Sequence, residues 1–267
     1  MARRRHDPES QHLRVTEHDG VRTLIFARNQ QSSMRLDDPF ETDIQYIGYL
    51  HIALAVKPSA TRALVIGLGG GSIVKRMWRD YPWMHIDAVE IDEQVAALAR
   101  DSFALPDDER INVIVGDGRE WLEVCDEAYD IIIIDAFADD HIPRPLTTEE
   151  FMRGCRDHLV TDGVVAYNVI GAVYGQHSRH FRSIHKTARN VWRRVWTFPT
   201  GIAGDPREQT RNIVMFASDA AITDDELLDR IASRVDGIVT VPAFERFAED
   251  FYPGAIRSGD VPIIADR

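Results

Sequence analysis

The stretch ALVIGLGGGSIVKRM, residues Ala63–Met77, decides the fold of this 267-residue chain. Four apolar residues run into a loop that holds four glycines, and a helical pattern begins at Ser72. Glycine loops of this kind allow positive φ angles and let a ligand approach the backbone closely. A strand, a glycine turn and a helix in this order indicate a nucleotide-binding unit of the α/β class. The alternative is that the glycines only permit tight packing of the helix on the sheet.

Short apolar runs alternate with helical patterns from Thr61 onward. The runs are RALVIG, HIDAVEID, INVIVGDG, YDIIIIDAF and GVVAYNVIG, in this order along the chain. Strands that are apolar along their whole length have helices on both faces, so the pattern predicts a mostly parallel, doubly wound, Rossmann-like sheet. RRVWTFPTG and TRNIVMFAS follow as two closing strands. We expect them to form an antiparallel edge of that sheet.

The first sixty residues follow different patterns. Residues 13–36 alternate weakly, with Asp19-Gly20 as a hairpin signal. Ile44, Ile47, Leu50 and Leu54 recur at helical spacing, so residues 37–60 are expected to form one helix closed by Pro58. We therefore expect a flexible tail over 1–12, a small N-terminal β-domain and linking helix over 13–57, and a Rossmann-like catalytic domain over 58–267.

Composition excludes some classes of function. The formal net charge of −12 argues against a nucleic-acid partner, which needs a positive surface. No apolar run is long enough to span a membrane. The two cysteines, Cys125 and Cys155, make no disulfide framework, which favours a reducing cytoplasm. His177, His180 and His185 share a predicted helix, but no Cys or acid lies at a zinc-ligand spacing, so a solvated helix face is the better interpretation and no metal is expected.

Acidic residues end the two strands that follow the glycine loop. Glu90 comes about twenty residues after the loop, where an acid can accept hydrogen bonds from ribose hydroxyls. Asp117, within Gly116–Gly118, could accept a hydrogen bond from an adenine amine. The glycine spacing differs from G-x-G-x-x-G and favours S-adenosylmethionine or its decarboxylated form over a dinucleotide.

From Val65 to Val169 the chain resembles the spermidine synthase (polyamine aminopropyltransferase) family, as a divergent member. The motifs that carry the resemblance are VIGLGGGSIVKR, AVEIDEQV, INVIVGDGREWL, YDIIIIDAF and LTTEEFM. The resemblance implies a class I methyltransferase fold, a homodimer, and a sulfonium donor bound without metal. It implies that Glu90 holds the ribose, that Asp117 and Gly118 contact the adenine, and that Asp135 lies beside the reacting centre. The donor-binding set is Gln31, Gly67, Gly69, Glu90, Ile91, Asp117, Gly118, Asp135 and Ala136, and the acceptor amine would meet Tyr46, Asp139 and Asp140.

Three departures from the family pattern bear on the acceptor. Gly70 stands where the family has an amine-holding Asp, and Ile47-Gly48 replaces a polar pair. The loop DAFADD keeps the first acid as Asp135 but places Ala138 where the family has its base. Asp139 would serve as the second catalytic acid if the loop shifts by one residue. A long polycation needs carboxylates along its groove, so these departures favour a smaller or less charged acceptor.

Three functions remain open at this point. The first is transfer of an aminopropyl group from decarboxylated S-adenosylmethionine to a small amine. The second is methyl transfer from S-adenosylmethionine, and the third is a noncatalytic nucleoside-binding protein. The loop around His141 could act as a lid or form only a turn shaped by its prolines. Asn168 could reach the acceptor or only cap its strand.

Overall fold

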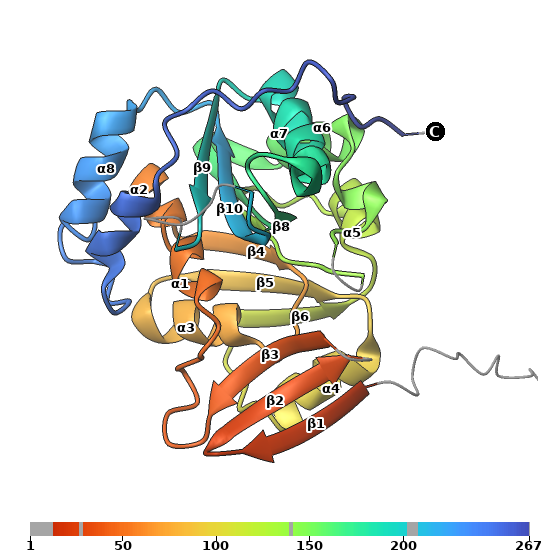
Figure 1. Ribbon diagram of the computed structural model, residues 1–267. Helices are drawn as coiled ribbons and strands as arrows, with labels where there is room; N and C mark the ends of the chain where they lie inside the picture. Colours follow the sequence, from red (N-terminus) through yellow and green to blue (C-terminus); the bar gives the residue numbers. More distant parts are fainter. Residues whose placement is uncertain (1–12, 27–28, 139–140, 202–207, 267) are drawn as a thin grey trace, which may run out of the picture.

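The protein is described by a computed structural model that covers residues 13–26, 29–138, 141–201 and 208–266. A seven-stranded sheet runs through its centre in the order β6-β5-β4-β7-β8-β10-β9 (Figure 1). Its strands are β4 (Arg62–Ile66), β5 (His85–Glu90), β6 (Ile111–Val115), β7 (Tyr129–Ile134), β8 (Leu159–Gly171), β9 (Arg194–Pro199) and β10 (Arg211–Ser218). The first five pair in parallel, and β10 pairs antiparallel to both β8 and β9. The predicted doubly wound sheet with an antiparallel edge is confirmed.

Helices cover both faces of this sheet, because alternate residues of each strand point to opposite sides. On β7, Ile131 and Ile133 belong to one buried cluster, and Ile132 and Ile134 belong to the other. The first face carries α1 (Tyr46–Leu50), α2 (Ala53–Val56), α3 (Ser72–Asp80), α4 (Glu93–Asp101) and α8 (Asp224–Ala232). The second carries α5 (Gly118–Val124), α6 (Glu149–Asp157) and α7 (Arg179–Val191). Short 3-10 helices lie at η2 (Arg144–Leu146), η3 (Gln176–Ser178) and η4 (Phe244–Asp250).

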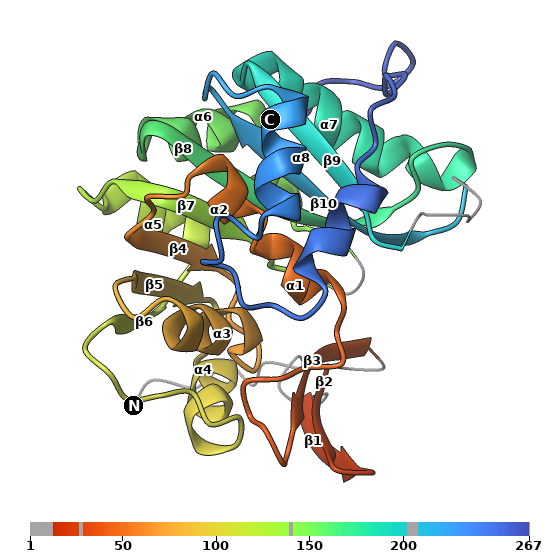
Figure 2. The same cartoon turned by 90° about the vertical axis from the view of Figure 1, so that its left-hand side faces the viewer.

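A second, antiparallel sheet precedes the main one. It consists of β1 (Leu13–His18), β2 (Val21–Phe26) and β3 (Asn29–Arg35). The β1–β2 turn is the predicted two-residue hairpin, with φ of 48° at Asp19 and 76° at Gly20. Figure 2 shows this sheet as a separate layer beside α3 and α4. Its buried Leu24 and Met34 pack against Phe103, which follows α4.

The single helix expected over residues 37–60 is wrong. Only α1 and α2 are helical, and the chain before Tyr46 forms turns. Two side chains compete with the helix there: Asp38 accepts the N–H of Phe40, and Thr42 accepts the N–H of Ile44. Polar side chains that satisfy the nearby backbone in this way stabilise turns at the expense of a helix. The tail over 1–12 lies outside the described residues. Within the described part of the chain, every helix is too short or too polar to cross a membrane.

Candidate functional site

A cavity of about 1200 Å³ opens at the carboxyl ends of the parallel strands. The strand β3 and the turn before α1 close it from the opposite side. The structure brings ten of the predicted site residues to its wall: Gln31, Tyr46, Gly67, Gly69, Glu90, Ile91, Asp117, Gly118, Asp135 and Ala136. Asp139 and Asp140 lie outside the described residues. Convergence of strand ends explains why residues far apart in sequence meet here.

Gly67 sits at the point where the glycine loop crosses the end of β7. Its φ is 96°, and a Cβ at this position would lie 2.4 Å from the backbone oxygen of Asp135. A side chain is therefore excluded by both conformation and space. The glycine lets the loop after β4 and the chain after β7 touch, which brings Asp135 next to the loop.

Glu90 shapes the glycine loop from the end of β5. Its Oε2 accepts the N–H groups of Leu68 at 2.9 Å and Gly69 at 3.3 Å, and its Oε1 accepts the N–H of Asp92 at 3.1 Å. A carboxylate has about four acceptor positions. Three of them are used for the backbone, so this buried side chain keeps capacity for one ligand hydroxyl. The sequence indicated a ligand role for Glu90 but not its part in holding the loop.

Asp117 begins α5 as its N-cap. Its Oδ1 accepts the N–H of Arg119 at 2.7 Å and of Glu120 at 3.3 Å. Both bonds use the same oxygen, so Oδ2 takes part in neither of them. Ile91, on the wall between Asp117 and the glycine loop, is 71% exposed. The exposed side chain of Ile91 and the Oδ2 of Asp117, which takes no part in the N-cap bonds, could contact a flat, amine-bearing base.

Asp135 follows β7 and lies at the middle of the cavity wall. Its Oδ2 accepts a hydrogen bond from the Tyr46 hydroxyl at 3.0 Å, and its Oδ1 accepts one from Nδ2 of Asn168 at 2.8 Å. Burial raises the pKa of Asp135 to about 7, against the two hydrogen bonds, which lower it. A carboxyl group with this pKa can accept and release a proton near neutral pH.

Asn168 and Asn212 were not predicted as a pair. Asn168, fully buried on β8, contacts Asp135, and its Oδ1 accepts a hydrogen bond from Nδ2 of Asn212 at 2.9 Å. Asn168 lies on the cavity wall, a position that agrees with the first of its two possible roles, contact with an acceptor. Asn212 was missed because it is the second residue of an antiparallel strand, whereas most of the predicted site residues come from the ends of parallel strands. The predicted antiparallel edge formed by RRVWTFPTG and TRNIVMFAS could have led to it.

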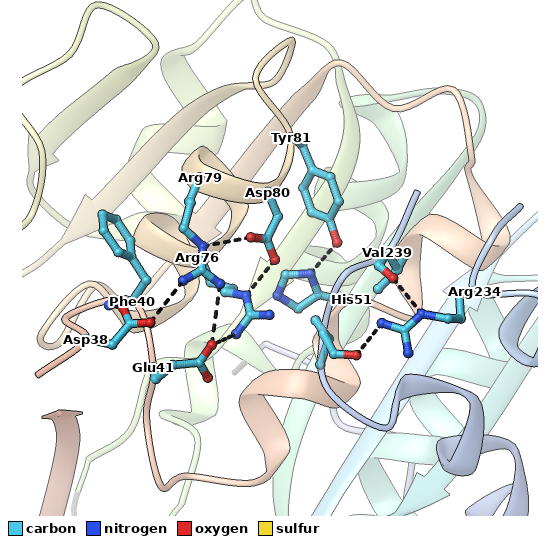
Figure 3. Close-up of polar contacts among 11 residues, drawn as sticks. Asp38, Phe40, Glu41, His51, Arg76, Arg79, Asp80, Tyr81, Arg234 and Val239 are labelled. Carbon is cyan, nitrogen blue, oxygen red and sulfur yellow. Dashed lines mark hydrogen bonds and ion pairs between the residues drawn. The ribbon is translucent and has the colours of Figure 1, made fainter. Parts of the chain in front are cut away.

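An ion-pair cluster fastens the chain before α1 to α3 (Figure 3). Arg76 lies between Glu41, at 2.8 Å, and Asp80, at 2.5 Å. Arg79 contacts the same Asp80 at 2.9 Å. The cluster ties Glu41 to α3, which leads directly from the glycine loop. It thereby fixes the turn that delivers Tyr46 to Asp135.

The strand β3 contacts the glycine loop directly. The Ser32 hydroxyl accepts the N–H of Gly70 at 2.7 Å, and the Ser72 hydroxyl donates to the Ser33 carbonyl at 3.2 Å. A Cβ at Gly70 would lie 2.8 Å from the Phe103 ring and 2.9 Å from Cβ of Ser32. The position that carries an amine-holding acid in the resembling family is thus closed to any side chain here.

The loop after Asp135 and the histidines differ in part from expectation. Ala138 and His141 form an isolated β-bridge, and Pro143 and Pro145 line the cavity, so the described part of this loop forms a turn and a wall. The solvated face predicted for the histidines is wrong in part. His180 and His185 are half-buried, and burial lowers the pKa of His185 to about 4. Among the described residues, no three potential ligands are grouped to hold a metal ion.

The electrostatics of the cavity are one-sided. Its described wall holds no lysine, arginine or histidine and six carboxylic acids: Asp43, Glu90, Asp92, Glu93, Asp117 and Asp135. A wall of this kind attracts cations and gives no ion-pair partner to a phosphate or a carboxylate.

Comparison with known proteins identifies the family of this chain. The model of the spermine/spermidine synthase domain matches residues 47–203, more than half of the chain. The chain belongs to the spermine/spermidine synthase family. A polyamine aminopropyltransferase of Vibrio vulnificus (strain CMCP6) is 32% identical over 185 residues, which are 65% of this chain and 62% of that protein. The chain thus spans about three fifths of the length of the curated relatives it matches first.

The fold of this spermine/spermidine synthase family member is similar to solved structures over nearly its whole length. A probable spermidine synthase from Corynebacterium glutamicum ATCC 13032 is 19% identical with a TM-score of 0.74, over 96% of this chain and 93% of that one. Human methyltransferase-like protein 13, solved with SAH, is 21% identical with a TM-score of 0.56, over 80% and 94%. The predicted methyltransferase-type fold is confirmed, and it is common to both proteins.

Proposed function

We propose that this chain transfers an aminopropyl group from decarboxylated S-adenosylmethionine to a small amine, as a polyamine aminopropyltransferase. The observation that carries the proposal is the acidic cavity, with six carboxylic acids and no basic side chain on its described wall. Both proposed substrates are cationic and lack a carboxylate or phosphate. The cavity therefore complements their charge and disfavours a dinucleotide or the carboxylate of S-adenosylmethionine itself.

The donor would occupy the half of the cavity above β4, β5 and β6. Glu90 has one acceptor position left for a ribose hydroxyl, and Oδ2 of Asp117 remains for the adenine amine. Ile91 would pack on the base, with Gly67, Gly69, Gly118, Gln31 and Ala136 completing the wall. When bound, the donor supplies a carbon activated by the neighbouring positive sulfur.

The acceptor would enter over β8 and β10 and meet Asp135 at the centre. A new bond would join its nitrogen to the propyl carbon while the carbon–sulfur bond breaks and sulfur keeps the electron pair. The nitrogen proton would pass to Asp135, whose pKa of about 7 suits a general base. Tyr46 would orient this carboxylate, and Asp139 and Asp140 would add charge for the ammonium form of the product.

The experiment is to incubate the purified protein with each sulfonium donor and a set of amines. Methylthioadenosine would support aminopropyl transfer, and S-adenosylhomocysteine would support methyl transfer instead. Binding of a donor without either product would support a noncatalytic protein. Asp135→Asn should abolish turnover while donor affinity, measured by calorimetry, changes little. Turnover that survives this substitution would place the chemistry elsewhere.

We also propose that the enzyme works in the cytoplasm as a metal-free homodimer. The unpaired cysteines Cys125 and Cys155 agree with a reducing compartment. Residues 13–57 would form the N-terminal β-domain with its linking segment, and 58–267 the catalytic domain. Sedimentation equilibrium tests the dimer, and activity in excess chelator tests the absence of a metal requirement.

A further inference from the structure

We propose that Asn212 is a positioning residue that, through Asn168, fixes an amide N–H donor on Oδ1 of Asp135. The effect on catalysis rests on the proposed function, whereas the contacts among Asn212, Asn168 and Asp135 do not depend on it. Nδ2 of Asn212 lies 2.9 Å from Oδ1 of Asn168, and Nδ2 of Asn168 lies 2.8 Å from the Asp135 carboxylate. The three residues come from β10, β8 and the end of β7.

The strand register explains how these side chains meet. Asn212 pairs with Ile170, and Val214 pairs with Asn168, so the two asparagines are diagonal neighbours on the same face of the sheet. The last paired residues of β7 and β8 are Ile134 and Tyr167, directly before Asp135 and Asn168. Because β10 is antiparallel, its first residues lie at the edge where β7 and β8 end. The row therefore runs straight across the sheet edge.

The direction of the hydrogen bonds follows from the chemistry of the groups. An ionised carboxylate only accepts, so Asn168 must turn its N–H toward Asp135. Its carbonyl oxygen then faces Asn212, which must donate. Asn168 has no exposed surface, and its amide nitrogen and oxygen both have protein partners in Asp135 and Asn212. Asn212 is thus the residue that makes one amide orientation of Asn168 favourable.

Few charged groups face Asp135 in the described structure. Tyr46, from α1, is the titratable group that contacts it, and the glycine loop packs on its backbone through Gly67. Glu90 and Asp117 line the same cavity from β5 and the start of α5. Burial disfavours the carboxylate form of Asp135, whereas the N–H of Asn168 and the O–H of Tyr46 favour it. A change of amide orientation at Asn168 would therefore act directly on its proton affinity.

Asn212→Asp is the decisive substitution, because it keeps the shape and converts a donor into an acceptor. Asn168 must then turn its N–H toward residue 212 and present its carbonyl to Asp135. We expect the pKa of Asp135 to rise by about one unit or more. The measurement is ¹³C NMR of aspartate carboxyl carbons in the free protein, with the Asp135 signal assigned by its loss in Asp135→Asn. No donor, acceptor or turnover is needed for this readout.

Two further variants separate the hydrogen-bond row from simple charge. In an Asn168→Leu background the row is broken, so adding Asn212→Asp should leave the Asp135 midpoint unchanged. A shift that persists there would show a through-space effect and overturn the proposal. Asn112→Asp on β6 is the matched control, since Asn112 also donates to a carboxylate, Asp87, at 2.9 Å, but lies on a different strand. It should leave the midpoint of Asp135 in place.

The outcomes also separate this proposal from the proposed function. An unchanged Asp135 midpoint in Asn212→Asp refutes the positioning role, even if the wild type forms methylthioadenosine. A raised midpoint with no product from any donor and amine supports the positioning role and refutes the proposed function. Should Asn212→Asp fail to fold, Asn212→Ala must give a smaller rise in the same direction, and no rise refutes the role.

Discussion

Replacing Asp80 by Asn is expected to destabilise the protein by about 3 kcal/mol. Asp80 is 4% exposed and Arg76 is 8% exposed, and their contact is 2.5 Å. The substitution leaves a buried guanidinium without its nearest carboxylate, and breaking a buried pair of this kind costs about 3–5 kcal/mol. Glu41 remains 2.8 Å from Arg76 and partly compensates, so the lower end of that range applies.

Glu41→Gln is the matched control within the same cluster. Glu41 is 32% exposed, so water replaces its interactions with Arg76 and Arg79. Its loss should cost about 1 kcal/mol or less. With an m-value of about 3 kcal/mol per molar urea, the unfolding midpoints should fall by about 1 M for Asp80→Asn and by about 0.3 M for Glu41→Gln.

The pH dependence adds a second test. Burial alone would raise the pKa of Asp80, but hydrogen bonds from Arg76 and Arg79 hold it below the ordinary value of 3.8. A lowered pKa stabilises the folded state above pH 3.8, and this contribution is lost as the pH falls through the folded pKa. The difference between the wild type and Asp80→Asn should therefore shrink below about pH 4. Equal midpoint shifts for both variants, or a difference that grows in acid, would contradict the reasoning.

Three other substitutions, with Gly154→Ala as a control, test the site. Tyr46→Phe removes a hydrogen bond to the Asp135 carboxylate and should raise the pKa of Asp135 by about one unit. Because less of the carboxylate is then ionised, kcat/KM should fall about fivefold at pH 7 and hardly at pH 9. A ratio of variant to wild-type kcat/KM that does not vary with pH would contradict this role of Tyr46. Gly67→Ala, with its positive φ and a Cβ 2.4 Å from a backbone oxygen, should cost about 2–4 kcal/mol in thermal unfolding. Gly154→Ala on α6, where a Cβ meets nothing within 4 Å, should be neutral or stabilising; equal losses would refute the steric argument. Gly70→Asp should weaken donor binding in calorimetry rather than improve diamine use, and tighter binding would show that the loop yields.

The strand tips were predictable because their chemistry is local. Each parallel strand ends at the same edge, so Gly67, Glu90 and Asp117 could be assigned to one site from three separate motifs. Asp135 was assigned to that site through the family resemblance. The alternation of apolar runs and helical patterns was sufficient to predict a doubly wound, mostly parallel sheet, but not the order of its strands. The hydrogen bonds that these side chains make to the backbone could not be predicted from the motifs. Glu90 is an example, because its bonds to the glycine loop depend on the exact distance between β4 and β5.

The missing parts of the prediction depend on contacts between distant segments. Ser32 reaches Gly70 only because a separate sheet packs on the loop, and no sequence period records that packing. Asn212 reaches Asn168 only through the antiparallel register of β10 and β8. The apolar spacing from Ile44 onward predicted a helix too early, because Asp38 and Thr42 bind the backbone there.

The hydroxyl of Ser32 has a practical consequence for anyone who transplants this fold. A graft of the seven-stranded sheet alone would carry the glycine loop but leave the N–H of Gly70 without its acceptor and one side of the cavity open to bulk water. The three short strands at the start of the chain are therefore part of the cavity wall and must be transferred together with the sheet. A chimera joined after residue 57 would need a host whose own N-terminal sheet places a hydroxyl within hydrogen-bond distance of the Gly70 N–H.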